Sequence, residues 1–198
     1  MAIGCPGNSP RSGHRKPQDT AALAIPILLA GWLAPASGYP EQSRYTSLEQ
    51  GCKTSWYQGQ PAEACPGVGG WSVWVVDEQE RTYLVLRRKG FSLNLRREIF
   101  SGSLGLFPGI HSPDNPAAES RAEWRLTNHS APRALIVRIH GQDPEKSLQV
   151  DPHPYQSRLL VVRLGADACV LGIASNNEVA RQLADGPGDC SGAQGEHP

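Results

Sequence analysis

Residues 65–88 read CPGVGGWSVWVVDEQERTYLVLRR, and this stretch determines the expected fold. From Trp71 to Val76 the side chains alternate with a period of two residues, and large apolar groups occupy both sets of positions. A charged turn at 77–80 leads into a second apolar run at 82–86. This pattern predicts two antiparallel strands joined by a short turn. The first strand is expected to be central in its sheet, because both of its faces carry apolar side chains.

The same period recurs along the chain. Further strands are expected at 91–95, 122–126, 134–140, 158–164 and 168–174. One short helix should follow, because Ser175-Asn176-Asn177-Glu178 fits a capping box with Ser175 as N-cap, and Gly186-Pro187 supplies a left-handed glycine cap and a stop. The expected fold is mainly β: an antiparallel β-sandwich or a partly open barrel with one short C-terminal helix. The period does not distinguish sandwich from barrel.

Four segments show no such period. Residues 39–50 read as a loosely held lead-in, 52–65 as a disulfide-closed loop, and 99–121 and 141–156 as long loops. Trp56 and Tyr57 lie in the second of these and are expected to pack back on the core; an exposed aromatic contact is the alternative. The glycines at 67–70 precede a strand rather than a helix, so they indicate a tight turn and not a phosphate-binding loop.

The amino end indicates export. Arg11, Arg15 and Lys16 precede a 13-residue apolar run at 21–33, and small residues then permit cleavage after Ala36 or Gly38. Thirteen residues interrupted by a proline are too few to span a bilayer core of about 30 Å. An uncleaved anchor or a buried helix is the alternative. The expected organisation is a signal peptide at 1–38, a β-domain at 39–190 and a disordered tail at 191–198, with a periplasmic or secreted location and no stable membrane span after cleavage.

Four cysteines remain after such a cleavage: Cys52, Cys65, Cys169 and Cys190. An even count in an exported chain favours two disulfides. Of the three possible pairings we expect Cys52–Cys65 with Cys169–Cys190, because each closes a short loop beside turn-forming residues. No Cys-x-x-Cys pair is present, which argues against structural zinc and against a thioredoxin-type role.

The loops contain the residues that could support chemistry. His140, Asp143, Asp151 and His153, with His111 and Asp114 from the other long loop, are types that bind zinc. No two of these histidines have the close spacing that places two imidazoles on one face, and solvated turn residues are the more frequent explanation. Ser101 and Ser103 lack the strand–turn–helix elbow of a hydrolase nucleophile. No catalytic residue and no cofactor is therefore assigned, and His140, Asp143 and His153 stand as candidate metal ligands.

Charge excludes one class of partner. The formal net charge is zero, so nothing indicates nucleic acid. A local basic cluster is formed by Arg87, Arg88, Lys89, Arg96 and Arg97. A polyanion or an acidic protein could bind there, but such charges more often keep sheet edges soluble.

The cysteine and strand motifs resemble a group of uncharacterised exported proteins of alpha-proteobacteria. The resembling pieces are YTSL at 45–48 before Cys52, CPGVGG at 65–70, AEWR at 122–125, ALIVR at 134–138, LVVRLG at 160–165, ACVLG at 168–172, and residues 180–186 before Cys190. The resemblance implies a periplasmic or secreted location and supports both disulfides. It implies no activity, and the histidine-bearing loops lie outside its motifs.

The sequence therefore predicts a non-enzymatic binding or structural module whose partner is a periplasmic protein or an envelope component. The alternatives are a metal-dependent hydrolase that uses His140, Asp143 and His153, and an inhibitor of a cell-wall lytic enzyme.

Overall fold

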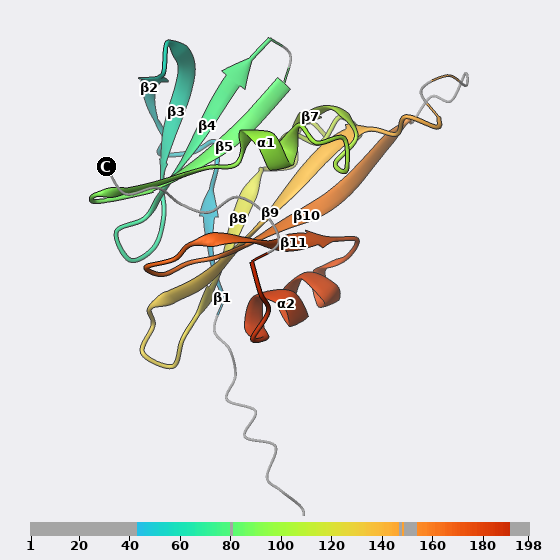
Figure 1. Cartoon of the computed structure of the whole chain (residues 1–198). Helices are drawn as coiled ribbons and strands as arrows, with labels where there is room; N and C mark the ends of the chain where they lie inside the picture. The colour runs from blue at the N-terminus through green and yellow to red at the C-terminus, as the bar shows by residue number, and fades with distance from the viewer. Residues whose placement is uncertain (1–42, 80, 147, 149–153, 191–198) are drawn as a thin grey trace, which may run out of the picture. The chain divides into compact units, whose positions relative to one another are not determined.

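The computed structural model describes residues 43–79, 81–146, 148 and 154–190 (Figure 1). These residues form two antiparallel sheets and two helices. The five-stranded sheet has the order β2 (Lys53–Tyr57), β3 (Gln60–Pro66), β4 (Ser72–Glu78), β5 (Arg81–Arg88) and β6 (Phe91–Asn94). The six-stranded sheet has the order β1 (Ser43–Ser47), β8 (Arg121–Leu126), β9 (Pro132–Gln142), β10 (Tyr155–Arg163) and β11 (Cys169–Ala174), and β7 (Leu106–Gly109) pairs with the far end of β9. The helices are α1 (Arg96–Ile99) and α2 (Asn177–Asp185).

The two sheets are separate and enclose one apolar core, so the fold is a β-sandwich and not a barrel. Alternate residues of β4 and β5 meet alternate residues of β8 and β9 in this core. The largest fully buried side chain is that of Trp124, whose indole N–H donates to the Thr46 hydroxyl at 2.8 Å. The sequence predicted this fold class correctly, including the seven strands expected at 71–76, 82–86, 91–95, 122–126, 134–140, 158–164 and 168–174.

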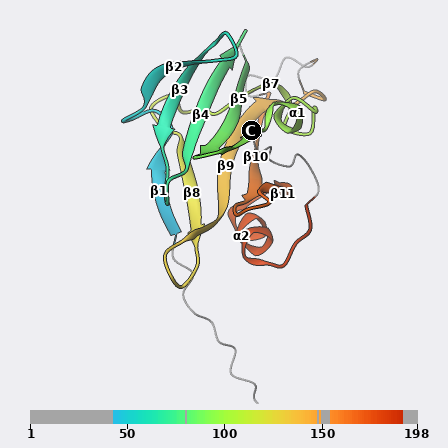
Figure 2. The same cartoon turned by 60° about the vertical axis from the view of Figure 1, so that its left-hand side comes forward.

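The opposite face of the six-stranded sheet is covered by α2. Both views show this helix against β10 and β11 (Figures 1 and 2), and its Ala180 and Ala184 pack into a second apolar cluster with residues of β9 to β11. Beside this cluster Arg125 makes two hydrogen bonds to the carboxylate of Asp185, at 2.9 and 2.6 Å. A helix of nine residues is too short to be stable in water alone, so this docking supplies its stability.

Both disulfides have the expected pairing, Cys52–Cys65 and Cys169–Cys190. The first links the start of β2 to the end of β3. The second links β11 to the segment that follows α2 and so fastens the helix to its sheet. Each closes a loop of 13 or 21 residues, for which the chain-entropy relation gives about 3 kcal/mol of stabilisation.

Strand β4 is central in the five-stranded sheet, as expected. One face of the strand is buried at Val73, while on the other face Trp74 stays partly exposed. The Trp74 ring contacts the edge of Tyr57 and lies 4.6 Å beneath the guanidinium of Arg87. Further along this outer face Val76 and Tyr83 are buried, and Phe100 at the end of α1 packs against the Tyr83 ring.

Three segments expected to lack regular structure contain strands. Residues 43–47 form β1, residues 53–57 and 60–66 form the hairpin β2–β3, and residues 106–109 form β7; α1 begins before the segment expected to be irregular and ends inside it. The prediction for these segments was wrong, because the strands are short and several of their side chains are polar and solvent-exposed. Tertiary pairing decides their conformation, and their own propensity does not.

The caps of α2 also differ from the expectation. Asn176, and not Ser175, is the N-cap, and its side chain accepts a hydrogen bond from the Val179 amide at 3.0 Å. Gly186 has a φ of −77°, so it is not a left-handed cap. No helix in the described part of the chain is long and apolar enough to cross a membrane. The expected signal peptide and the expected disordered tail lie outside the described residues.

Candidate functional site: an acidic groove between the sheets

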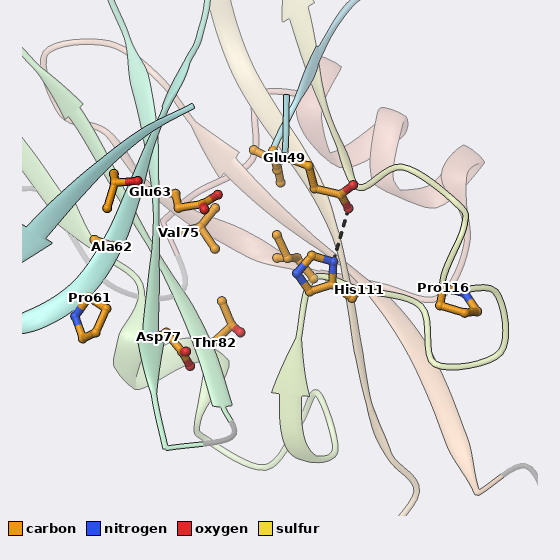
Figure 3. Close-up of a pocket in the computed structure, with 12 residues that line it drawn as sticks. Glu49, Pro61, Ala62, Glu63, Val75, Asp77, Thr82, His111 and Pro116 are labelled. Atoms are coloured by element: carbon orange, nitrogen blue, oxygen red, sulfur yellow. Dashed lines mark hydrogen bonds and ion pairs between the residues drawn. The ribbon is translucent and has the colours of Figure 1, made fainter. Parts of the chain in front are cut away.

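An open groove of about 800 Å³ lies beside the five-stranded sheet (Figure 3). One wall comes from β2 to β5, and the other comes from the connections that follow β1 and β7. Buried apolar side chains form its floor, and polar side chains line its sides. The residues lining it are Leu48, Glu49, Thr54, Pro61, Ala62, Glu63, Val75, Asp77, Thr82, Ile110, His111 and Pro116.

Glu63 and Asp77 carry the acidic charge of one wall. Both are exposed, and both occupy positions on β3 and β4 that face the six-stranded sheet, since Glu63 is paired with Val75 across the strands. Neither carboxylate makes a hydrogen bond or ion pair with another described residue. Figure 3 shows both on the side of the groove opposite Glu49 and His111. Two carboxylates without internal partners are available to a ligand.

Glu49 and His111 form a pair on the facing wall. The Nδ1 atom of His111 lies 3.2 Å from Oε1 of Glu49, and the same oxygen accepts a hydrogen bond from the Ser120 amide at 2.9 Å (Figure 3). Hydrogen bonds from Ser120, and to a smaller extent the neighbouring His111, lower the pKa of Glu49 below its ordinary value. This carboxylate therefore stays ionised in weakly acidic solution.

Trp56 stands beside the groove. It is directly across from the groove residue Pro61 in the β2–β3 register, and 68% of its surface is exposed. The expectation that it packs on the core was wrong, whereas Tyr57 does pack, against Trp74. Because β2 is a regular strand, these two consecutive residues point to opposite faces of the sheet.

The lining of the groove is acidic. Three carboxylates line it, no lysine or arginine does, and two threonine hydroxyls, of Thr54 and Thr82, add hydrogen-bonding capacity. An exposed indole at the margin adds a surface for the aliphatic stem or the charged head of a cationic side chain. No serine or cysteine lines the groove, so the Glu49–His111 pair has neither of these as a nucleophile to activate.

Of the described residues considered as metal ligands, His111 lines the groove, whereas His140 and Asp143 do not. His140 lies on β9, where it pairs with Gly109 of β7 and Ser157 of β10. Its side chain is on the same face of the strand as that of Arg138. Burial, and then the charge of Arg138, lower the pKa of His140, although Asp114 opposes this. Asp143 accepts a hydrogen bond from the Glu145 amide at 3.0 Å, which is the contact of a turn-forming residue. His153 and Asp151 lie outside the described residues.

One cluster of metal-ligating residue types occurs among the described residues: Cys52, Glu63 and Cys65. Its two sulfur atoms are bonded to each other in the first disulfide, so they are not thiolate ligands. The cluster shows instead that the Glu63 carboxylate lies within 4.8 Å of the disulfide. Ser101 and Ser103 line a different pocket, of about 550 Å³, with residues of β11.

Most members of the basic cluster have internal contacts. Arg88 lies over the Trp71 ring at 4.8 Å and Arg87 over Trp74, while Arg96 makes two hydrogen bonds with Glu78, at 2.7 and 2.6 Å. These contacts favour the structural explanation of the cluster.

Comparison of the chain with protein-family models, with curated proteins and with solved structures finds no match. The two disulfides are compatible with an oxidising compartment.

Glu49, Glu63 and Asp77 were not identified as site residues from the sequence, and Trp56 was expected to pack on the core. A usable signal was present at 61–65, where Glu63 occupies the position between two residues of one strand face, Pro61 and Cys65. Because Glu63 lies on the same strand face as the buried Cys65, its charge indicates that this face becomes exposed to solvent at Glu63. That signal is readable only once 60–66 is recognised as a strand.

Proposed function

We propose that this protein is a non-enzymatic binding module of an oxidising compartment, periplasmic or extracellular, and that it binds a partner bearing cationic groups in the acidic groove. The single observation that carries the proposal is the pair Glu63 and Asp77, two exposed carboxylates with no partner among the described residues, in a groove lined by no lysine or arginine. Unpaired charges of one sign in a concave site attract the opposite charge and raise its local concentration.

The compartment rests on three supports. They are the two disulfides, the export-type residues at 1–38, and the resemblance to exported proteins of alpha-proteobacteria. The partner is then a periplasmic protein or an envelope component with amines or guanidinium groups at its surface.

Titration with spermine, followed by NMR, tests the charge of the groove. We expect shifts at Glu49, Glu63, Asp77 and Thr82, and an affinity that falls as salt rises. The double variant E63Q/D77N should weaken binding at least fivefold. The matched control E145Q/D167N removes two exposed carboxylates elsewhere and should change the affinity less than twofold. Equal losses in the two variants would refute the groove as the site.

Spermine binding should weaken as the pH falls, because the carboxylates of the groove lose their charge. The pKa of Glu49 is lowered in the folded protein, so its charge persists as pH falls through the ordinary range of a glutamate and is lost only below it. Binding measured from pH 7 downwards should therefore keep a Glu49-dependent component into weak acid, and the variant E49Q should lack that component.

A further inference from the structure

The edge of β2 adjoins the acidic groove. Within the described part of the chain β2 pairs with β3 alone, so its other edge presents backbone N–H and C=O groups. Thr54 of this strand lines the groove and lies opposite Glu63. An edge with unpaired backbone groups is a template for another strand.

The alternation along β2 sets which side chains of an added strand would meet the groove. Thr54 and Trp56 share the face of Glu63 and Pro61, which line the groove, and Tyr57 belongs to the other face, where it contacts Trp74. A strand paired with β2 would continue this alternation, so every second side chain would lie on the groove side.

Distance selects the side chain. An added strand would lie about two strand spacings, roughly 10 Å, from β3. Lysine and arginine are long enough to cross β2 over the exposed Trp56 ring and reach the carboxylate of Glu63. Their stems would cover the indole, and their charges would meet the unpaired carboxylates.

We propose that the partner is an extended polypeptide segment with basic residues at alternate positions, which adds as a strand to the edge of β2 and directs those residues into the groove. This rests on the proposed function, because the groove supplies the charge. A second copy of the chain fits less well: its β2 would bring Thr54 and Trp56, and no cation, to the groove side.

A ten-residue peptide of alternating lysine and valine, blocked at both ends, is the probe. We expect it to bind the folded domain at least tenfold more tightly than the same peptide with glutamate for lysine, as measured by calorimetry at low salt. Hydrogen exchange of amides in β2 should slow on binding.

Backbone methylation separates strand addition from simple charge attraction. In an added strand every second amide faces β2, so methylating one alternate set of peptide amides should weaken binding more than tenfold and methylating the other set less than threefold. Equal effects of the two sets would overturn strand addition. The variant W56A should weaken binding about fivefold, and F107A, which removes another aromatic with 54% exposure, should not.

The remaining outcomes are also decisive. If spermine binds the groove and the peptide does not, the proposed function stands and this inference fails. If neither binds, both fail. If amides in β2 of the free protein become protected as its concentration rises, a second copy occupies the edge, and the inference is again overturned.

Discussion

The closed core and the open groove differ sharply although β3 and β4 contribute to both. At the closed end Cys65 and Val73 are fully buried and Trp124 fills the interior. Two residues along the same strands, Glu63 and Val75 line the open groove. Side chains two residues apart on a strand share a face. The change from buried core to open groove therefore follows from which residues occupy successive positions on one face of β3 and β4.

Covalent and steric constraints concentrate at the closed end. The backbone of Gly67 lies so close to Trp124 that an added Cβ would be 2.6 Å from the indole ring, and Gly69 has a φ of +62°. The Cys52–Cys65 disulfide lies beside this corner. The glycine corner and the disulfide thus close one end of the core, while the carboxylates of Glu63 and Asp77 leave the groove open to water.

The largest contrast should come from two tryptophans. Trp124→Ala removes a fully buried ring at the closed end and should lower the free energy of unfolding by about 4 kcal/mol, the range typical of buried aromatic truncation. Trp56→Ala, at the open end, should change it by less than about 0.5 kcal/mol. Urea unfolding with both disulfides kept oxidised measures the pair. Similar losses would mean that the groove is not open in solution.

Two glutamates give the next contrast. Glu123 is 8% exposed and accepts hydrogen bonds from Ser43 at 2.7 Å and Arg181 at 2.8 Å. Burial alone would raise the pKa of Glu123, but these hydrogen bonds and the nearby arginine charges outweigh it and lower the pKa. Glu123 therefore stabilises the fold above the ordinary pKa of a glutamate, and this contribution is lost as pH falls through the lowered value.

The substitution E123Q should cost about 2–3 kcal/mol at pH 7, because hydrogen bonds to a charged group are lost and arginines lose their counter-charge. E63Q should be neutral in stability within about 0.5 kcal/mol, and its effect should appear in spermine affinity alone. A stability loss for E63Q as large as for E123Q would contradict the finding that Glu63 has no partner among the described residues.

The sequence sufficed for the closed half of the molecule. Runs such as 71–76 and 134–140 are apolar at the positions that meet the core, and both disulfides link segments near in sequence. The groove was not predictable in the same way, because β2 and β3 are short, exposed strands stabilised by pairing. Unless these strands are recognised, Glu63 cannot be assigned to a face of a sheet, and Asp77 is interpreted as a turn residue. The Glu49–His111 contact spans 62 residues, so no local pattern encodes it.

Two valines in one row test the comparison more finely. Val73→Thr buries a hydroxyl at the closed end and should cost about 1–2 kcal/mol, since nothing apolar there can accept its hydrogen bond. Val75→Thr places the same group against the groove, where water reaches it, and should cost less than about 0.5 kcal/mol. The midpoint of urea unfolding, at constant slope, distinguishes the two. Equal costs would place Val75 in the dry core.

The smallest effect concerns the turn that holds the groove wall. Gln58 and Gly59 join β2 to β3 with φ values of +50° and +82°, so both residues of this two-residue turn are left-handed. Asparagine tolerates the first position better than glutamine does, and Gln58→Asn should stabilise the domain by about 0.5 kcal/mol.

Gly59→Ala is the matched substitution with the opposite expected effect. A Cβ there meets no atom within 4 Å, so its cost of about 1 kcal/mol would come from backbone conformation alone. Both changes should leave spermine affinity unaltered, because neither residue lines the groove. An affinity that follows turn stability would show that the hairpin, and with it the groove wall, becomes ordered only when a ligand binds.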